Sequence, residues 1–574
     1  MLIILSLIIF VAFTVKSTCR RGSKSNLDQM GAVERSSRPS SLLSMSTPND
    51  HPNATTRKDV EGATTASTSE YKVYPMRWFI LMTVNLLALS NATMWMTYTS
   101  STEATAKFYC NTTSEGAGCE ISKWTSQIFQ LMGTILGIMG MYVTDKHGIK
   151  VSARAGCLLN MMGALIRIVS SIPTIPFESR TGILHCGTII VSSAQPFFLV
   201  LSPKVAEYWF PEDQRAFANV LSFIANPLGV ALGTIIPIFI MDSGVGLDSS
   251  HFLTLNIILA TVPVVAFIMS MLIRKGVPPT APSASSDNHS AAPDFCMALG
   301  MLFKNKHFYV ILIVFGGAFG QLWSVYTASD ILLNILGYSP SITGFMIVIA
   351  CAFGVAISLV FGVYVDKTKK FKEVIRVCMI GFFFTSIAFN VLTRFKPSEC
   401  GKYEAGFVPL LVVINALLGM FSIPVFPIGI ELGIEATFPI QEATSSGLLV
   451  IMGQLELFIV ILAMDGARSF TGLDMAPAIK INPSLNTTRI EPSMNHTLAN
   501  DIWCGVSLVS ALIAIFLLNP PYKRVAFEKE HKEKVDSART TPHPSETAVE
   551  VETVHPLRSS SRDRSPSDKD STSP

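Results

Sequence analysis

The stretch that decides the fold is Gly140-Met-Tyr-Val-Thr-Asp145-Lys146-His147-Gly148-Ile-Lys150. A related stretch follows later in the chain: Gly362-Val-Tyr-Val-Asp366-Lys367-Thr-Lys369-Lys370-Phe-Lys372. Each comes directly after a long apolar segment, the second and the eighth of the chain, so the two stretches take corresponding places in two halves. A duplicated membrane bundle of six plus six helices gives this arrangement. We therefore expect an alternating-access transporter rather than an enzyme or a soluble binding module.

The composition supports a chain that lies mostly in lipid. Of its 574 residues, 49% are hydrophobic and only 15% are charged, whereas a soluble domain carries about 25% charged residues. The formal net charge of +3 comes without a basic stripe, so no nucleic-acid partner is expected. The ten cysteines form no CxxC pair or zinc-type cluster, so we expect no metal and no cofactor.

Twelve membrane spans follow from the apolar segments, since one helix needs roughly 20 apolar residues to cross the hydrocarbon. The expected spans are 77–99, 124–143, 151–171, 182–201, 216–240, 251–273, 308–330, 342–365, 373–393, 406–430, 443–464 and 501–519. The fold class is thus an all-α membrane protein with two pseudo-symmetric six-helix bundles. The expected segments are a disordered tail (1–74) whose short apolar start has no clear role, a first bundle (75–275), a central loop (276–306), a second bundle (307–521) and a disordered tail (522–574).

Charge and glycosylation signals predict the orientation. The loops after spans two, four, six and eight are rich in Lys and Arg, which is typical of the cytosolic side. The sequons at Asn111, Asn486 and Asn495 all fall in loops on the other side. Both main termini are therefore expected in the cytosol. The plasma membrane is the default location, and a lysosomal membrane is compatible with the same topology.

Cys110 and Cys119 bracket a short polar loop that also contains the Asn111 sequon. A disulfide that closes a lumenal loop is the reading we favour, and two unpaired surface thiols are the alternative.

The two related stretches are candidates for a latch between the halves. Asp145 and Asp366 suit the positive end of a helix dipole, while Lys146, Lys150 and Lys367 can bind carboxylates or lipid phosphates. Ordinary positive-inside charge is the alternative. Glu431 and Glu435, near the end of span ten, are expected to form a gating salt bridge with the lysine-rich loops. The pair of stretches resembles the signature loops of the major facilitator superfamily.

Longer strings resemble a narrower family. They are Ser90-Asn91-Ala92-Thr-Met-Trp95, Ser202-Pro203-Lys204-Val-Ala-Glu-Tyr-Trp209-Phe210-Pro211-Glu212, Asn226-Pro227-Leu228-Gly229 and, in the second half, Gly453-Gln454. Together with their surroundings they cover roughly residues 75–520 and look like solute carrier family 49, the feline leukaemia virus subgroup C receptor-type transporters. Within that family the resemblance is greatest to the third member.

This resemblance implies a central cavity lined by spans one, four, seven and eleven. The relatives that carry choline and ethanolamine hold the cationic headgroup between aromatics on spans one and seven. Trp95 matches the first, and Trp323 stands where those relatives have Tyr. The cavity glutamines of spans four and eleven match Gln195 and Gln454. Because the hydroxyl of the Tyr is missing here, the relatives' substrate is not carried over directly.

The residues themselves support an aromatic cation site. Trp is the strongest cation–π partner, worth about 0.5–2 kcal/mol per contact, and Tyr98 is a further substrate-binding candidate near the outer end of span one. The alternatives are an interfacial belt for the aromatics and helix–helix hydrogen bonds for the glutamines.

Glu456 is the proton-coupling candidate because an ionisable residue inside a span is costly. It lies two residues after Gln454, about 200° round the helix, so the two side chains cannot share one face. Arg167 on span three is its possible ionic partner; the alternative for Arg167 is a residue at the end of a span whose side chain reaches for the membrane surface.

These observations predict a transporter for a small organic solute, with a choline- or ethanolamine-like cation as the best candidate. The alternative is a planar heterocycle, haem or a B6 vitamer, with possible proton coupling; haem would prefer an axial ligand, and His147, His185, His251 and His307 look structural. A membrane receptor or an intramembrane enzyme is a remote alternative. The expected partners are the solute and the lipid bilayer, and the chain is expected to be monomeric.

Overall fold

The computed structural model describes residues 71–111, 119–241, 249–287, 293–335, 338, 340–394, 407–470, 478–482, 487–491 and 497–540. Residues 71–74 have no regular secondary structure and precede the first helix. The remainder of the predicted N-terminal tail and the end of the C-terminal tail lie outside the described residues.

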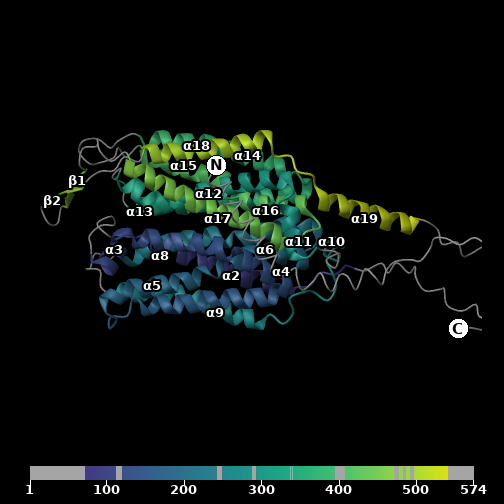
Figure 1. Cartoon of the computed structure of the whole chain (residues 1–574), viewed down its shortest axis with the longest axis horizontal. Helices are drawn as coiled ribbons and strands as arrows, with labels where there is room; N and C mark the ends of the chain where they lie inside the picture. Colours follow the sequence, from purple (N-terminus) through teal and green to yellow (C-terminus); the bar gives the residue numbers. More distant parts are fainter. Residues whose placement is uncertain are drawn as a thin grey trace, which may run out of the picture. The chain divides into compact units, whose positions relative to one another are not determined.

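The first half of the chain forms helices that match its apolar segments. They are α2 (Met76–Met96), α3 (Thr102–Cys110), α4 (Ile121–Val169), α5 (Phe177–Ser192), α6 (Gln195–Trp209), the 3₁₀ turn η1 (Glu212–Gln214), α7 (Arg215–Phe223), α8 (Ala225–Met241) and α9 (Ser249–Leu272). Figure 1 shows these helices in purple to blue, packed together. Two short helices, α10 (Ala284–Asp287) and α11 (Phe295–Leu302), occupy part of the predicted central loop.

The second half repeats this design. It contains α12 (Lys306–Ile335), α13 (Pro340–Thr368), α14 (Phe371–Leu392), α15 (Phe407–Ser422), α16 (Val425–Thr437), α17 (Glu442–Phe470), α18 (Thr497–Phe516) and α19 (Lys523–Thr540). Between α17 and α18 lie two short strands, β1 (Ala478–Asn482) and β2 (Thr487–Glu491), which pair antiparallel with Ala478 opposite Glu491.

The 49-residue helix α4 accounts for two of the predicted spans. At 1.5 Å per residue it is about 73 Å long, more than twice the hydrocarbon thickness of about 30 Å. Its path breaks at Gly148, whose φ of 76° is a conformation that glycine adopts without a steric penalty. The described residues contain eleven helices long and apolar enough to cross a membrane, and with α4 counted as two spans they provide the twelve expected crossings.

Prolines divide three of the predicted spans. The spans predicted at 182–201, 216–240 and 406–430 are each two helices in sequence, and the later helix begins just before or after a proline: Pro196, Pro227 and Pro424. Proline suits the first turn of a helix, where its missing N–H is not needed, and disfavours a helix interior.

Four spans form the protein interior. In the most apolar stretch of α2, α5–α6, α12 and α17, 67–83% of the residues are buried, against 39–50% in the other seven spans of the described chain. The outer spans carry exposed apolar side chains such as Phe239, Val360, Phe384 and Phe516, as lipid contact requires. The spans that the family resemblance assigned to the cavity are therefore the central ones.

One prediction about the tails is wrong. The segment 522–574 was expected to be disordered, yet it begins with the helix α19, and Arg524 and Glu528 on its first turns are buried. Composition alone missed this helix because its stability comes from contacts with residues far away in the sequence, which are described below.

Candidate substrate site and gates

A pair of tryptophans joins the two halves. Trp95 on α2 and Trp323 on α12 are 3% and 4% exposed, and their rings meet edge to face with centroids 5.7 Å apart. The indole Nε1–H of Trp95 donates a 2.8 Å hydrogen bond to the hydroxyl of Ser126 on α4, which fixes its ring. Full burial inside the bundle leaves neither ring free to act as an interfacial belt residue.

A stripe of small and polar residues on α4 continues inward from this pair. Ser126, Gln130 and Gly133 are spaced four and three residues apart, so they share one face of the helix. A Cβ added at Gly133 would lie 2.8 Å from Oε1 of Gln195 and 3.4 Å from Cγ of Gln454. The structure therefore brings together the two glutamines of spans four and eleven, against a glycine that leaves room for them.

The side-chain amides in this region are buried without hydrogen-bond partners in the described chain. Both amide atoms of Gln130 and Gln454, and Oε1 of Gln195, are in this state. A buried polar group without a partner is costly, so such a set is typical of a site that a ligand or water completes. The alternative role for Gln195 and Gln454, a helix–helix hydrogen bond, is not seen for these atoms.

Sequence reasoning missed three glutamines of the same kind. Gln127 and Gln130 on α4 and Gln321 on α12 are at most 1% exposed; the amide atoms of Gln127 and Gln130 lack hydrogen-bond partners in the described chain, whereas the amide of Gln321 lies beside the carboxyl of Glu456. The available signal was their position within apolar segments, since polar residues inside a membrane mark functional sites.

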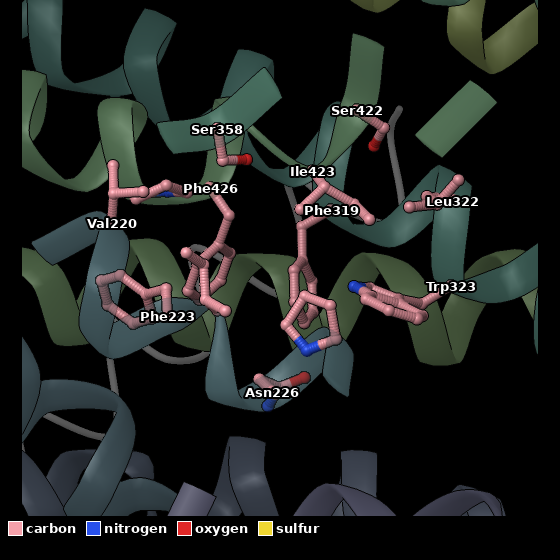
Figure 2. A pocket seen from close by; sticks show the side chains of 13 residues that line it. Val220, Phe223, Asn226, Phe319, Leu322, Trp323, Ser358, Ser422, Ile423 and Phe426 are labelled. Atoms are coloured by element: carbon pink, nitrogen blue, oxygen red, sulfur yellow. The ribbon is translucent and has the colours of Figure 1, made fainter. Parts of the chain in front are cut away.

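A pocket that Trp323 helps to line lies between helices of the two halves. Its walls come from α7 and α8 and from α12, α13, α15 and α16, and its empty volume is about 460 Å³, including solvent at its mouth. Figure 2 shows Ser358 and Ser422 on one side, Asn226 on the other and aromatic rings between them. None of the thirteen lining residues is His, Cys or Tyr, the side chains that often ligate haem iron.

The aromatic rings of this pocket form a continuous series. Phe223 meets Phe426 at 4.7 Å, Phe426 meets Phe319 at 4.9 Å, and Phe319 meets Trp323 at 6.5 Å between centroids. Trp323 thus contacts both this aromatic series and Trp95.

Tyr98 is placed differently from the tryptophans. Its hydroxyl donates a 2.8 Å hydrogen bond to Asn256, and the guanidinium of Arg167 lies 4.7 Å from the centre of its ring. These contacts keep Tyr98 within the first half, so the structure does not bring it together with Gln195 and Gln454.

Glu456 and Gln454 have different neighbours, as their spacing on the helix predicts. A Cβ added at Gly316 of α12 would lie 2.6 Å from Oε2 of Glu456, whereas Gln454 lies against α4. Oε1 of Glu456 is buried without a partner in the described chain. The suggested ion pair between Glu456 and Arg167 is absent from the ion pairs of the described residues, and Arg167 instead donates to the carbonyl of Met94.

The two related aspartates lie at one end of the bundle, which we name the charged end. Each aspartate contacts the opposite half. Asp145 accepts a 2.7 Å hydrogen bond from Lys204 in its own half and another from Thr444 in the first turn of α17. Asp366 accepts backbone hydrogen bonds from Ala216 and Phe217, 3.1 and 2.7 Å long, at the start of α7. Each aspartate therefore lies at a helix N-terminus, where the dipole favours negative charge.

Three lysines expected to act in the latch, namely Lys146, Lys150 and Lys367, do not share this role. Lys146 donates to the hydroxyl of Tyr142 on its own helix, and the exposed Lys367 and the half-buried Lys150 make no side-chain hydrogen bond or ion pair with other described residues. The ion-pair partner of Asp145 is Lys204, which is 2% exposed and which sequence reasoning placed among ordinary positive loop charges.

Glu431 and Glu435 bind a residue that no motif indicated. Arg524, on the first turn of α19, forms ion pairs with Glu207 of the first half at 3.0 Å and with Glu431 and Glu435 of the second. The predicted partners were the lysine-rich loops, and the structure corrects this to Arg524. We name Arg524 and these three carboxylates the clasp.

A second ionic contact extends the clasp. Glu528 lies 2.8 Å from Nη1 of Arg215 and accepts a hydrogen bond from Ser285 of the central loop. Burial alone would raise the pKa of Glu528, but Arg215 and Arg524 more than offset this and hold it below its usual value. Burial likewise works against the charged form of Arg524, and Glu431, Glu207 and Glu435 still raise its pKa well above the usual value. Both groups are therefore charged near neutral pH.

The opposite end of the bundle, the disulfide end, has its own contacts. Cys110 and Cys119 form the predicted disulfide. Lys123 at the start of α4 lies 2.6 Å from Asp465 of α17, an ion pair between the two halves. Asn111 is exposed and ends α3, whereas Asn486 and Asn495 lie outside the described residues.

Comparison with known proteins identifies the family and several similar proteins. Residues 120–459 match the model of the Major Facilitator Superfamily. The chain is 28% identical to Solute carrier family 49 member A3 of Danio rerio over 84% of this chain and 94% of that protein, and 29% identical to the Xenopus tropicalis protein of the same name over 80% and 90%. It is 27% identical to the Choline/ethanolamine transporter flvcr2a of Danio rerio over 67% of this chain and 79% of that protein. The family resemblance seen in the sequence is confirmed.

Solved structures confirm the fold class. The proton:xylose symporter XylE bound to 6-bromo-6-deoxy-D-glucose superimposes with a TM-score of 0.58, covering 79% of this chain and 99% of that one. At 14% identity this likeness concerns the fold alone.

Proposed function

The chain belongs to the major facilitator superfamily, which is a family of membrane transporters and not of enzymes, and we propose that it carries a small organic cation of the choline or ethanolamine class. Transport would proceed by alternating access, with the two halves rocking about the central helices α2, α6, α12 and α17.

The observation that carries this proposal is the buried pair of Trp95 and Trp323. Indole faces attract quaternary ammonium groups by about 0.5–2 kcal/mol per contact, more where water is excluded. The two rings come from different halves of the chain, so a cation held between them would contact both halves. A ligand that contacts both halves can favour one arrangement of the halves over another.

The glutamines support the polarity of such a ligand. Ser126, which holds Trp95, and Gly133, which faces Gln195 and Gln454, are seven residues apart, or about 10 Å along α4. Neutral amides in this region could bind the hydroxyl of choline or ethanolamine without placing a second charge in the site, while the ammonium group contacts the tryptophans. The choline/ethanolamine transporters among the relatives add weight to the same class.

The test is uptake of radiolabelled choline and ethanolamine into cells that express the chain, at equal surface expression. Trp95→Ala and Trp323→Ala should each abolish uptake that the parent supports. Trp124→Ala is the matched control, because Trp124 is 44% exposed on the same bundle and should retain parental uptake. Absence of uptake by a well-expressed parent would refute the proposed substrate class.

A planar heterocycle is the second candidate, favoured by the aromatic pocket of Phe223, Phe319 and Phe426 beside Trp323. A B6 vitamer could stack there, and the buried carboxyl of Glu456 could bind the coupled proton. Uptake of labelled pyridoxine, driven by an inward proton gradient and lost in Glu456→Gln, would establish this candidate; the same assay with labelled haem tests the haem alternative.

We further propose that the charged end faces the cytosol, so that both main termini are cytosolic, and that the protein acts as a monomer in the plasma membrane. The lysines of the charged end and the exposed sequon at Asn111 support this orientation. Surface biotinylation of intact cells, compared with co-staining of lysosomes, tests the location.

A further inference from the structure

Arg167 is a buried arginine without a counter-ion. It lies near the end of α4 in the first half and is 1% exposed. One nitrogen, Nη1, donates a 3.0 Å hydrogen bond to the carbonyl of Met94. No carboxylate pairs with Arg167 among the ion pairs of the described residues. Every other buried arginine in those ion pairs, namely Arg215 and Arg524, has at least two carboxylates.

The free nitrogens of Arg167 form one edge of the guanidinium. Nε and Nη2 are both buried, and neither has a hydrogen-bond partner in the described chain. Their N–H bonds point in parallel from the same side of the planar group, which is the geometry by which arginine binds anions with two hydrogen bonds. The guanidinium carbon lies over the ring of Tyr98, 4.7 Å from its centre. The edge that remains is therefore shaped for an anion and has none from the protein.

The arginine cannot avoid this problem by losing its proton. The guanidinium group of arginine is always charged in proteins. An unpaired charge in a dry interior is strongly unfavourable. Nearby polar groups offer no negative charge: His185 has a buried Nδ1 without a partner, and Ser170 and Tyr109 hydrogen-bond to each other.

We propose that the Nε–Nη2 edge of Arg167 binds a small monovalent inorganic anion, with chloride as the abundant candidate. One guanidinium edge offers two N–H donors, which suits a small anion that accepts both. The buried Nδ1 of His185, when it carries the proton, can donate a further hydrogen bond to the anion.

Because of the position of this site, the bound anion should affect the tryptophan pair. The carbonyl that Arg167 binds belongs to Met94, the residue directly before Trp95. A bound anion neutralises the positive charge next to the tryptophan pair and holds the end of α2 through Arg167. The inference does not depend on which solute the chain transports.

The test is thermal unfolding of the purified full chain in sodium chloride and in sodium gluconate at equal ionic strength. Chloride should raise the Tm of the parent by about 2–4 °C with saturation, as expected when a ligand binds only the folded state. Arg167→Met, which keeps the length of the side chain and removes its charge, should lose this shift. Arg154→Met is the control and should keep it, because Arg154 donates to the carbonyls of Met271 and Ile273 and is partly exposed.

Direct binding of radioactive chloride to the parent makes the test independent of how well Arg167→Met folds. About one saturable chloride per chain, displaced by bromide and not by gluconate, supports the site. Equal Tm values of the parent in both salts together with no saturable chloride binding would overturn it, as would a folded Arg167→Met variant that retains the full chloride shift.

Discussion

Asp366, at the end of α13 in the second half, accepts a 2.7 Å hydrogen bond from the backbone N–H of Phe217, at the start of α7 in the first half. The related Asp145 of the first half makes the corresponding contact with Thr444 at the start of α17 in the second. The repeat seen in the sequence is therefore a reciprocal exchange of contacts across the charged end. Such an exchange closes this end in the conformation described here, and both contacts must break when it opens.

Loss of the carboxylate of Asp145 should destabilise the closed charged end. Asp145→Asn keeps the acceptor for Thr444 but leaves the buried Lys204 without its ion-pair partner, which costs about 3–5 kcal/mol. Thermal unfolding in detergent should show a lower Tm for this variant, and Asp145→Asn combined with Lys204→Met should recover much of the loss. Lys146→Met, at an exposed position, should match the parent. A single variant as stable as the parent would contradict the importance of the pair.

Removal of α19 should open the clasp. A chain truncated after Pro521 loses Arg524 and leaves Glu207, Glu431 and Glu435 buried without this cation. We expect a clear fall in Tm and faster proteolysis at the charged end. A chain truncated after Thr540 retains the helix and should resemble the parent; equal effects of the two truncations would show that the clasp adds no stability.

The ion pair of Glu528 with Arg215, which extends the clasp, should respond to acid. Because the pKa of Glu528 is held below its usual value, its contribution to stability is complete above the unfolded pKa of about 4.3 and is lost as the pH falls through the lower folded value. The difference in stability between the parent and Glu528→Gln should therefore be constant from about pH 8 to 5 and shrink below about pH 4. Glu530→Gln is the control, since Glu530 is 63% exposed. A difference that shrinks already near pH 6 would disagree with the assigned ion pairs.

Trp323→Tyr tests whether choline uptake needs only an aromatic ring at this position or the full size of tryptophan. Tyrosine keeps a cation–π face, so choline uptake should fall less than tenfold, whereas Trp323→Leu should abolish it. Trp95→Ala combined with Trp323→Ala should be no worse than either single change, because the rings act as one site. Concentration-dependent uptake of labelled choline measures all of these, and equal uptake by the Leu and Tyr variants would rule out cation–π binding at this position.

Asn111 should carry the glycan that reports the orientation. It is exposed, ends α3 and directly follows Cys110 of the disulfide. Treatment with peptide N-glycosidase should shift the parent on a gel, and Asn111→Gln should remove part of this shift, leaving any glycan on Asn486 and Asn495. The variant lacking all three sequons should not shift; a complete absence of glycan on the parent would argue against a lumenal disulfide end.

The sequence by itself determined the class of protein, the number and order of the spans, and the two related aspartates, because hydrophobic length, charge bias and duplicated strings are local or repetitive properties. It also identified Trp95, Trp323, Gln195 and Gln454 through family resemblance. Only the tertiary structure decided their relations: that the tryptophans touch, that both glutamines meet at Gly133, and that Tyr98 turns toward Asn256 instead.

The ionic partners of the buried side chains likewise could not be predicted from the sequence. Lys204 and Arg524 look like ordinary basic residues near membrane spans, and Arg167 looks like a residue that reaches for the membrane surface. In the structure, Lys204 forms an ion pair with a residue 59 positions away, and Arg524 forms the clasp with a residue 317 positions away. Arg167 is buried, and one edge of its guanidinium has no partner in the described chain. Electrostatic partners are chosen by proximity after folding, and no local pattern of residues encodes that choice.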